Sequence, residues 1–168
     1  NKVTQVSSIA IDSFEVSPDG TRIVYSAPRD EKDETSQGSI WIMNVDGSNT
    51  RKLTNIEGDS SPAWSPNGEY IAFSSLGKNH DIRQIYIMDK NGGNLSQITK
   101  SPFSKNNPCW SPDGIKLCYE AYTHNSATDQ SELFVINWNG TQESRILNMR
   151  KSLSNQWPTL SNPHWAAD

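Results

Sequence analysis

The sequence predicts an all-β fold in which one four-stranded antiparallel unit occurs three times. Three observations support this fold class. A Ser-Pro turn recurs in steps of 48 and 46 residues, an apolar run recurs in steps of 45 and 48, and a hairpin dipeptide follows each apolar run. A period of about 20 to 50 residues is typical of proteins in which similar supersecondary units stack on one another.

The Ser-Pro turn joins the first two strands of each unit. Its copies are 16–20 (Val-Ser-Pro-Asp-Gly), 64–68 (Trp-Ser-Pro-Asn-Gly) and 110–114 (Trp-Ser-Pro-Asp-Gly), and a fourth copy begins at Trp165. Proline presets the backbone at the second position of a type I turn, and glycine at the fourth accepts a positive φ. Each copy is therefore expected to reverse the chain, and the tryptophans before it are expected to pack between units.

A two-residue hairpin joins the third and fourth strands. The apolar runs at 40–43, 85–88 and 133–136 form the third strands, and they are followed by Asp46-Gly47, Asn91-Gly92 and Asn139-Gly140. These dipeptides favour turns in which both central residues have a positive φ. Six residues beyond each glycine is an aliphatic residue in a short fourth strand, namely Leu53, Ile98 or Ile146.

The hydrophobic pattern indicates how the units pack. The second strand of the middle unit alternates, with Ile71 and Phe73 on one face and Tyr70 and Ala72 on the other, whereas the third strands are apolar at nearly every position. A strand without a polar face is covered on both sides. Twisted sheets with two apolar faces stack on copies of themselves, and the closed form of that arrangement is a β-propeller with one sheet per blade. A β-sandwich is the alternative, but it gives no reason for a fixed repeat.

The predicted blades cover 14–54, 62–99 and 108–147 of a single propeller segment, 1–168. A partial strand is expected at each end, at 2–7 and at 163–168. Propellers have about four to eight blades, so three blades should not close a ring alone. Three explanations follow: a fragment of a longer chain, which we favour, copies that associate to complete a ring, or an open arc.

A longer pattern links the turn, the third strand and the hairpin: Pro-x-Trp-Ser-Pro-Asp/Asn-Gly, a β-branched strand, Ile-Tyr-Ile-Met-Asp-x-x-Gly-Gly and x-x-Ile-Thr. It resembles the propeller repeats of TolB, a periplasmic protein of the bacterial Tol system, and is similar to the propellers of tricorn and prolyl-oligopeptidase-type peptidases. The resemblance implies a periplasmic or secreted protein with an envelope partner such as a peptidoglycan-associated lipoprotein. Such repeats occur in proteins with different functions, so the resemblance is specific for the fold.

The topology of the predicted blades sorts the connections between two ends. All six tight turns lie at one end, and the long, variable connections lie at the other. Binding residues concentrate on loops that a rigid scaffold presents, and aromatic and cationic side chains are enriched at protein interfaces. We therefore predict that a protein partner binds the long-loop end, through Arg29, His80, Arg83, Phe103, Tyr122, His124 and Trp157.

Several function classes are disfavoured by composition and motif. The net charge of −4 argues against nucleic-acid binding, and no apolar stretch approaches a membrane span. No Gly-x-Ser-x-Gly elbow occurs, and the calcium-like start at Asp89 has Lys100 where a bidentate Glu is needed. The expected function is a non-catalytic protein-binding scaffold without cofactor or metal. The alternative is the propeller of a larger hydrolase, either a tricorn or prolyl-oligopeptidase-type peptidase or a polysaccharide-degrading enzyme, with its active site elsewhere.

The two cysteines flank one predicted turn. Cys109 and Cys118 align with Ala63 and Ala72 of the preceding unit, so small, packed side chains are expected at both positions. Two buried free thiols and a cross-strand disulfide both satisfy this pattern.

Overall fold

The described part of the chain folds into twelve β-strands in three sheets. The computed structural model describes residues 11–28, 38–55, 58–77, 82–125, 128–150 and 165. The first blade contains β1 Ser13–Val16, β2 Arg22–Pro28, β3 Gly38–Asn44 and β4 Arg51–Lys52; the second contains β5 Ser60–Trp64, β6 Tyr70–Ser75, β7 Gln84–Asp89 and β8 Ser96–Gln97; the third contains β9 Ser104–Trp110, β10 Lys116–Asn125, β11 Thr128–Asn137 and β12 Ser144–Arg150.

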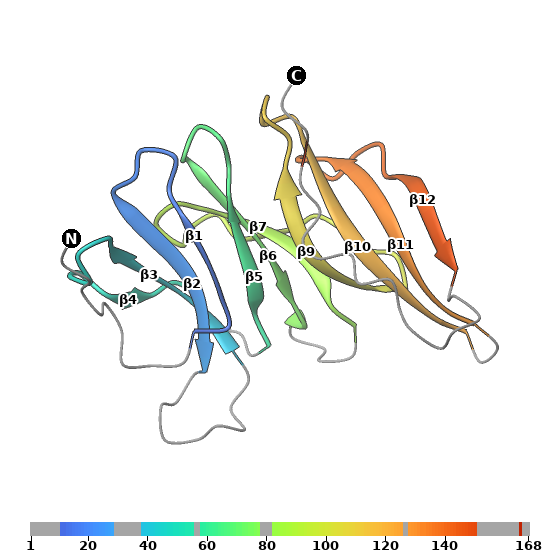
Figure 1. Ribbon diagram of the computed structural model, residues 1–168, viewed down its shortest axis with the longest axis horizontal. Coiled ribbons are helices and arrows are strands. Elements are labelled where there is room, and N and C mark those ends of the chain that lie inside the picture. The colour runs from blue at the N-terminus through green and yellow to red at the C-terminus, as the bar shows by residue number, and fades with distance from the viewer. Residues whose placement is uncertain are drawn as a thin grey trace.

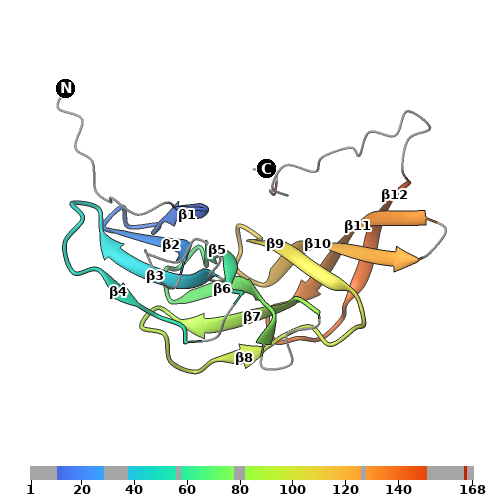
Figure 2. The same cartoon turned by 90° about the horizontal axis from the view of Figure 1, so that it is seen from below.

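Each sheet is an antiparallel meander of four strands in chain order. The all-β prediction and the four-stranded repeat are therefore confirmed. The sheets span 13–52, 60–97 and 104–150. They stand side by side in an open arc, with β1, β5 and β9 along its inner side and β4 and β8 along its outer side (Figures 1 and 2). The partial strands expected at 2–7 and 163–168 lie outside the described residues, except for Trp165.

The described residues form three core layers, of which two lie between blades and the third contains Tyr25, Ala27 and Met43 of the first blade. Side chains of β2 and β3 meet those of β6 and β7 in a layer that contains Val24, Ile40, Ile42, Trp64, Ile71, Phe73 and Met88. The opposite face of the second blade meets the third in a layer that contains Ala72, Ile85, Ile87, Ile98, Trp110, Leu117, Tyr119, Ala121 and Ile136. The second blade thus buries both faces, as its apolar third strand predicts.

The Ser-Pro turns share one hydrogen-bond pattern. In the first blade the Ser17 hydroxyl donates to the Asp19 carboxylate at 2.6 Å and accepts the backbone N–H of Arg22 at 2.9 Å. Ser65 makes the same two contacts, with Asn67 as the acceptor. The serine therefore closes the turn from inside, which explains why both the hydroxyl and the short polar side chain recur.

The hairpin glycines are required by contacts between blades as well as by φ. Gly92 has a φ of 89°, and a Cβ there would lie 3.1 Å from the carbonyl oxygen of Leu53 in the preceding blade. Gly140 repeats this relation against Ile98. Since a side chain would intrude on the neighbouring backbone, the recurring glycine allows adjacent blades to pack closely.

Candidate functional site

The long connections join strand ends at the opposite end of the molecule from the Ser-Pro turns. In Figure 1 the turns after β1, β5 and β9 lie at the upper edge, and β2 ends at the lower edge, where β3 begins. Of the predicted binding residues, Arg29, His80 and Trp157 lie outside the described residues, and so does the side chain of His124. Arg83, Phe103 and Tyr122 are described.

These three residues meet around Ser104, the first residue of β9. Phe103 precedes it in the chain, Tyr122 is its Cα partner on β10, and its hydroxyl accepts the backbone N–H of Arg83 at 3.3 Å. The structure therefore brings the described members of the predicted set together, at the junction of the second and third blades.

The Arg83 side chain braces this end of the fold. Its Nη1 donates to the carbonyl oxygen of Gly58 and, at 3.1 Å, to the hydroxyl of Ser60. Its carbonyl oxygen accepts the N–H of Lys105 at 2.9 Å. Burial lowers the pKa of Arg83, and the nearby carboxylate of Asp59 opposes that shift. Asp59 is itself 1% exposed, and burial raises its pKa. Arg83 thus joins the entry of β5 to the start of β7 and to the next blade.

The other two predicted residues also have contacts within the fold. Phe103 is half-buried against the second core layer, and its carbonyl oxygen accepts the Lys105 amine at 2.6 Å. The Tyr122 hydroxyl donates to the carboxylate of Glu120 at 2.6 Å. Burial and this carboxylate raise the pKa of Tyr122 to about 12. At this end the side chains of Arg83 and Tyr122 are therefore held by hydrogen bonds within the fold.

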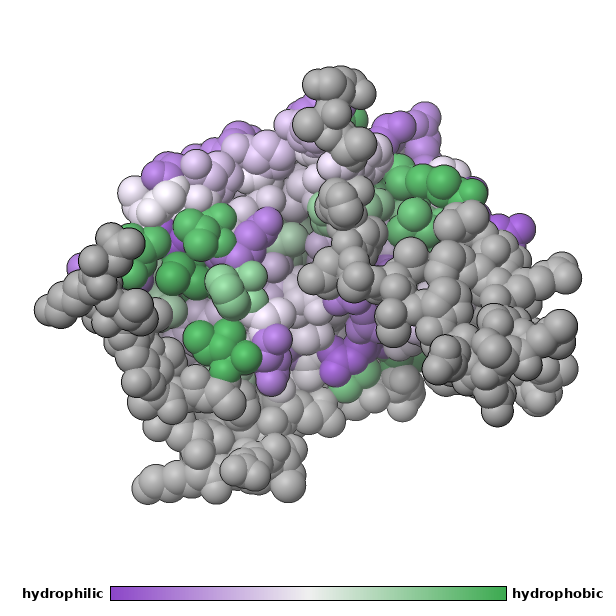
Figure 3. All heavy atoms as spheres, in the orientation of Figure 1, coloured by the Kyte–Doolittle hydropathy of each residue, from purple (hydrophilic) through white to green (hydrophobic). Residues whose placement is uncertain are grey.

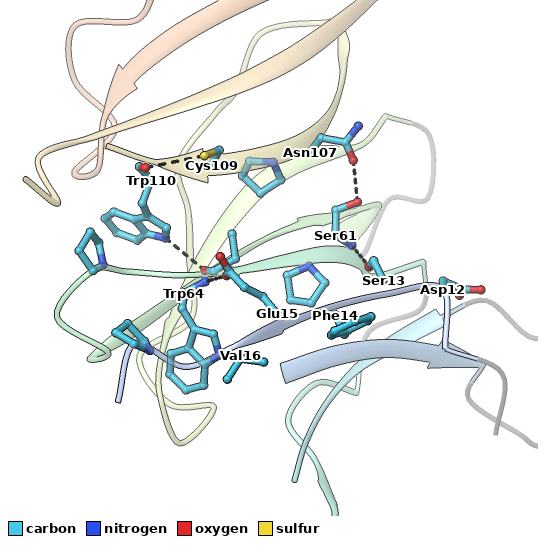
Figure 4. A pocket seen from close by; sticks show the side chains of 15 residues that line it. Asp12, Ser13, Phe14, Glu15, Val16, Ser61, Trp64, Asn107, Cys109 and Trp110 are labelled. Atoms are coloured by element: carbon cyan, nitrogen blue, oxygen red, sulfur yellow. Dashed lines mark hydrogen bonds between the residues drawn. The ribbon is translucent and has the colours of Figure 1, made fainter. Parts of the chain in front are cut away.

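A groove of about 1040 Å³ runs along the inner strands of all three blades (Figure 4). Phe14 and Val16 of β1 line it and are 65% and 45% exposed. Hydrophobic surface gathers over β1 on the left of Figure 3, which views the molecule from the inner side. Exposed apolar surface inside a concave site is a feature of binding grooves.

Hydrogen bonds tie the inner strands together across the floor of this groove (Figure 4). The Ser61 N–H donates to the hydroxyl of Ser13 at 3.1 Å, and the Ser61 hydroxyl donates to the Asn107 side-chain oxygen at 2.9 Å. The backbone N–H of Trp64 donates to the carboxylate of Glu15. Burial raises the pKa of Glu15, and this N–H opposes the shift. These contacts fix the groove's shape before any ligand arrives.

Sequence reasoning did not identify the groove, although a signal for it was present. Counted back from the turn serine, Phe14 occupies the position of Pro62, Glu15 that of Ala63 and Val16 that of Trp64. The first blade therefore departs from the repeat at three successive residues, and these line the groove together with their counterparts in the other two blades.

The cysteines are free thiols. Cys109 and Cys118 are Cα partners across β9 and β10, and Cys109 lines the groove whereas Cys118 is buried. A hydrogen bond between the two thiols lowers the pKa of Cys109 and raises that of Cys118. Among the described residues, no group of three or more His, Cys, Asp or Glu side chains is placed to hold a metal ion.

The repeated turns, hairpins and blades are those of a known family. A family model described as the TolB beta propeller domain matches residues 1–162. The chain belongs to this TolB propeller family. In the described residues, no helix is long and apolar enough to cross a membrane.

TolB-family relatives carry different names. The chain is 36% identical over 112 residues to the uncharacterized peptidase YuxL of Bacillus subtilis, covering 65% of this chain and 17% of that protein. It is 34% identical over 122 residues to the uncharacterized protein Atu1656 of Agrobacterium fabrum, covering 66% and 40%. It is 36% identical over 73 residues to the Tol-Pal system protein TolB of Zymomonas mobilis, covering 44% and 16%. The chain thus spans less than half the length of these relatives.

Solved structures show the same fold. A putative TolB from Agrobacterium tumefaciens superposes with a TM-score of 0.72 at 21% identity, over 86% of this chain and 52% of that one. The β-propeller domain of the trilobed protease from Pyrococcus furiosus superposes with a TM-score of 0.60 at 18% identity, over 86% and 43%. At these identities the likeness establishes the propeller architecture alone.

Proposed function

We propose that this chain is a non-catalytic propeller segment that binds a protein partner in the groove along β1, β5 and β9, which we call the axial groove, and at the long-loop end. The observation that carries the proposal is the exposure of Phe14 and Val16 in a groove whose floor is already cross-linked by hydrogen bonds. Apolar side chains held on a rigid frame bind with little loss of conformational entropy.

The polar groups of the groove support binding rather than chemistry. The Glu15 carboxylate accepts a backbone N–H of the next blade, and the Ser61 hydroxyl is engaged by Asn107. A general base or a nucleophile needs a geometry that leaves it available to a substrate. Here both groups serve the contact between strands.

The setting we propose is the bacterial envelope, in the periplasm or in secreted form, with a peptidoglycan-associated lipoprotein as the partner. The support is that relatives named Tol-Pal system protein TolB share 36% and 34% identity with part of this chain. Association of two copies to complete the ring is a further arrangement of the same segment, and sedimentation of the purified chain measures it.

The test measures binding of the full chain to the soluble domain of a peptidoglycan-associated lipoprotein by biolayer interferometry. Val16→Ser and Leu95→Ser form a matched pair, because the two side chains are 45% and 46% exposed and only Val16 lines the groove. We expect Val16→Ser and Phe14→Ser to weaken binding by about tenfold and Leu95→Ser by less than about twofold. Equal effects of Val16→Ser and Leu95→Ser would refute the groove as the binding site.

Alanine variants of Arg29 and Trp157 extend this test to the long-loop end predicted from the sequence. Weakened binding in these variants, with Leu95→Ser unchanged, supports a partner that covers both regions. Unchanged binding restricts the partner to the groove.

A second candidate function is the propeller domain of a larger hydrolase. The observation that favours it is the peptidase relative, which is 36% identical over 112 residues and of which the chain covers only 17%. The full reading frame distinguishes the two candidates, because a hydrolase domain with its own nucleophile encoded in the same frame supports the second. A frame that encodes only further propeller blades supports the first.

A further inference from the structure

A second cavity, of about 430 Å³, lies at the opposite end of the molecule, among the tight turns. Its walls are the Ser-Pro turns of the second and third blades, the rings of Tyr70 and Trp138, and the buried Trp110. Pro66 and Trp110 also line the axial groove, so they stand between the two cavities. The volume falls in the range of about 300–1,000 Å³ that is usual for small-ligand sites.

Trp138 is not explained by the repeat. It lies in the hairpin after β11, at the position of Val45 in the first blade and Lys90 in the second. In all three blades the backbone N–H at this position donates to a carbonyl oxygen next to the Ser-Pro turn, at 2.9 to 3.1 Å. The backbone at this position therefore makes the same contact in all three blades, whereas the side chain differs in each. Trp138 nevertheless remains 41% exposed.

The Trp138 ring is held in place by an aromatic neighbour. The rings of Tyr70 and Trp138 stack with their centroids 5.5 Å apart and their planes at 30°. Tyr70 comes from the second blade and Trp138 from the third, so the pair spans the boundary between blades. An indole held at the surface offers a π face whose negative quadrupole attracts cations.

The cavity also carries a negative charge. One oxygen of Asp113 accepts the Ser111 hydroxyl at 2.6 Å and the Ile115 N–H at 2.9 Å. These bonds hold the pKa of Asp113 below its usual value, so the carboxylate is ionised at neutral pH. The carboxylate is exposed to solvent. The walls contain no Lys or Arg, and Lys116 lies close enough to Asp113 to interact with its charge.

We propose that this cavity binds an organic cation, an ammonium or guanidinium head group, between the aromatic pair and Asp113. The rings supply faces that attract a weakly hydrated cation, and the carboxylate supplies the balancing charge. A neutral sugar also stacks on aromatic rings and donates hydroxyl hydrogen bonds to a carboxylate, so methyl glucoside is the competing ligand that the test must separate from the cation. The site lies away from the long-loop end and does not depend on the proposed function.

The test follows the indole N–H resonance of Trp138 by NMR in the full chain, assigned by its loss in Trp138→Phe. Choline is the first probe, 3,3-dimethylbutan-1-ol is its neutral isostere, and sodium chloride controls for ionic strength. We expect choline to shift the resonance saturably and the neutral isostere to bind at least about tenfold more weakly. N-acetyl-arginine methylamide, added separately, shows whether a peptide side chain binds better than a free ammonium ion.

The variants for this test introduce residues that already occupy the equivalent positions in other blades. Asp113→Asn removes the charge and keeps the turn, because Asn67 makes the same two contacts in the second blade. Asp19→Asn makes the same change in the first blade, away from the cavity. Trp138→Val installs the residue that the first blade has there. We expect Asp113→Asn to weaken choline binding about fivefold or more, Trp138→Val to abolish it and Asp19→Asn to leave it unchanged.

Three results overturn the proposal. They are equal affinity for choline and its neutral isostere, binding of methyl glucoside in place of choline, and an Asp113→Asn variant that binds choline as the wild type does. Circular dichroism confirms in each variant that the fold is retained, so a loss of binding is attributed to the site.

Discussion

The indole nitrogen of Trp110 donates a hydrogen bond to the carbonyl oxygen of Ala63, 3.2 Å away across the boundary between the second and third blades. The next tryptophan of the repeat does the same, because Trp165 donates to the carbonyl oxygen of Cys109 at 3.3 Å. Trp64 breaks the pattern, since its indole nitrogen is buried without a partner in the described structure. Trp110 therefore links β9 to β5 by a hydrogen bond, and Trp64 contributes to the packing between blades without one.

This difference makes Trp64 the control for Trp110. Both substitutions to Phe shorten a buried ring, but only Trp110→Phe removes a hydrogen bond, the one from the indole to the Ala63 carbonyl oxygen. We expect Trp110→Phe to lower the free energy of unfolding by about 1–2 kcal/mol more than Trp64→Phe. Urea denaturation followed by circular dichroism measures both values, and equal losses contradict the assigned role of the bond.

Alanine variants of Gly92 and Gly20 separate two costs in stability, that of backbone strain and that of disturbed packing between blades. Their φ angles are 89° and 71°, but a Cβ at Gly92 would lie 3.1 Å from the Leu53 carbonyl oxygen, whereas a Cβ at Gly20 would meet nothing within 4 Å. Gly20→Ala is expected to cost about 1 kcal/mol from the backbone alone. Gly92→Ala should cost at least about 1 kcal/mol more, because the blades must move apart. Thermal melts of the two variants are compared, and a Gly92 variant no less stable than the Gly20 variant argues against the contact.

Arg83 is expected to affect stability as well as binding. Arg83→Met keeps the aliphatic stem but removes the donors to Gly58 and Ser60 and the positive charge near Asp59. We expect a loss of about 1–3 kcal/mol in the free energy of unfolding. Arg51→Met is the control, because Arg51 is exposed and makes a hydrogen bond to the next blade, at 3.2 Å to the Asn91 carbonyl oxygen, beside a screened attraction to Asp89; its loss should stay within about 0.5 kcal/mol. Guanidinium titrations of both variants measure their free energies of unfolding. They show whether weaker partner binding by an Arg83 variant results from a less stable fold.

The contribution of Lys105 to the free energy of unfolding is expected to rise with pH in the alkaline range. Its side chain is 1% exposed and donates to the carbonyl oxygens of Ser101 and Phe103 at 2.9 and 2.6 Å. Burial lowers its pKa from 10.5 to about 8. Between these values the folded state releases the proton while the unfolded state holds it, so stability rises with pH, by at most about 1.4 kcal/mol per unit.

The comparison variant is Lys105→Met, which removes the titrating group. Between pH 8 and 10 the free energy of unfolding of the wild type should increase relative to that of the variant. Cys118 has a raised pKa and opposes the trend within this range in both proteins, so the prediction concerns the difference between them. Above pH 10, Tyr122, whose pKa is raised to about 12, opposes the trend as well, because tyrosines ionise in the unfolded state. Parallel curves for the two proteins would show that Lys105 keeps its ordinary pKa in the folded state.

The Ser-Pro turns and the strand order could be predicted because local chemistry determines them. The prediction of a two-residue hairpin was wrong in detail: only the glycine of each dipeptide has a positive φ, and its N–H closes the turn that begins at Asn44, Asp89 or Asn137. Ser17, Asp19 and Gly20 contact one another within one turn, and the same is true of their counterparts in the other blades. The contacts of the predicted site residues could be anticipated only in part. Arg83, Phe103 and Tyr122 do meet at the long-loop end, but the sequence does not show that each already has a partner in the fold.

The sequence by itself determined the repeated blade, because alternation, turn residues and hairpin dipeptides act over a few neighbouring positions. Tertiary structure alone decided which departures from the repeat lie in a cavity, because that depends on contacts between residues about one blade apart. Phe14 became part of the axial groove and Trp138 part of the turn-end cavity when neighbouring blades supplied their other walls. Lys105 was buried for the same reason, and its charge state followed from that burial.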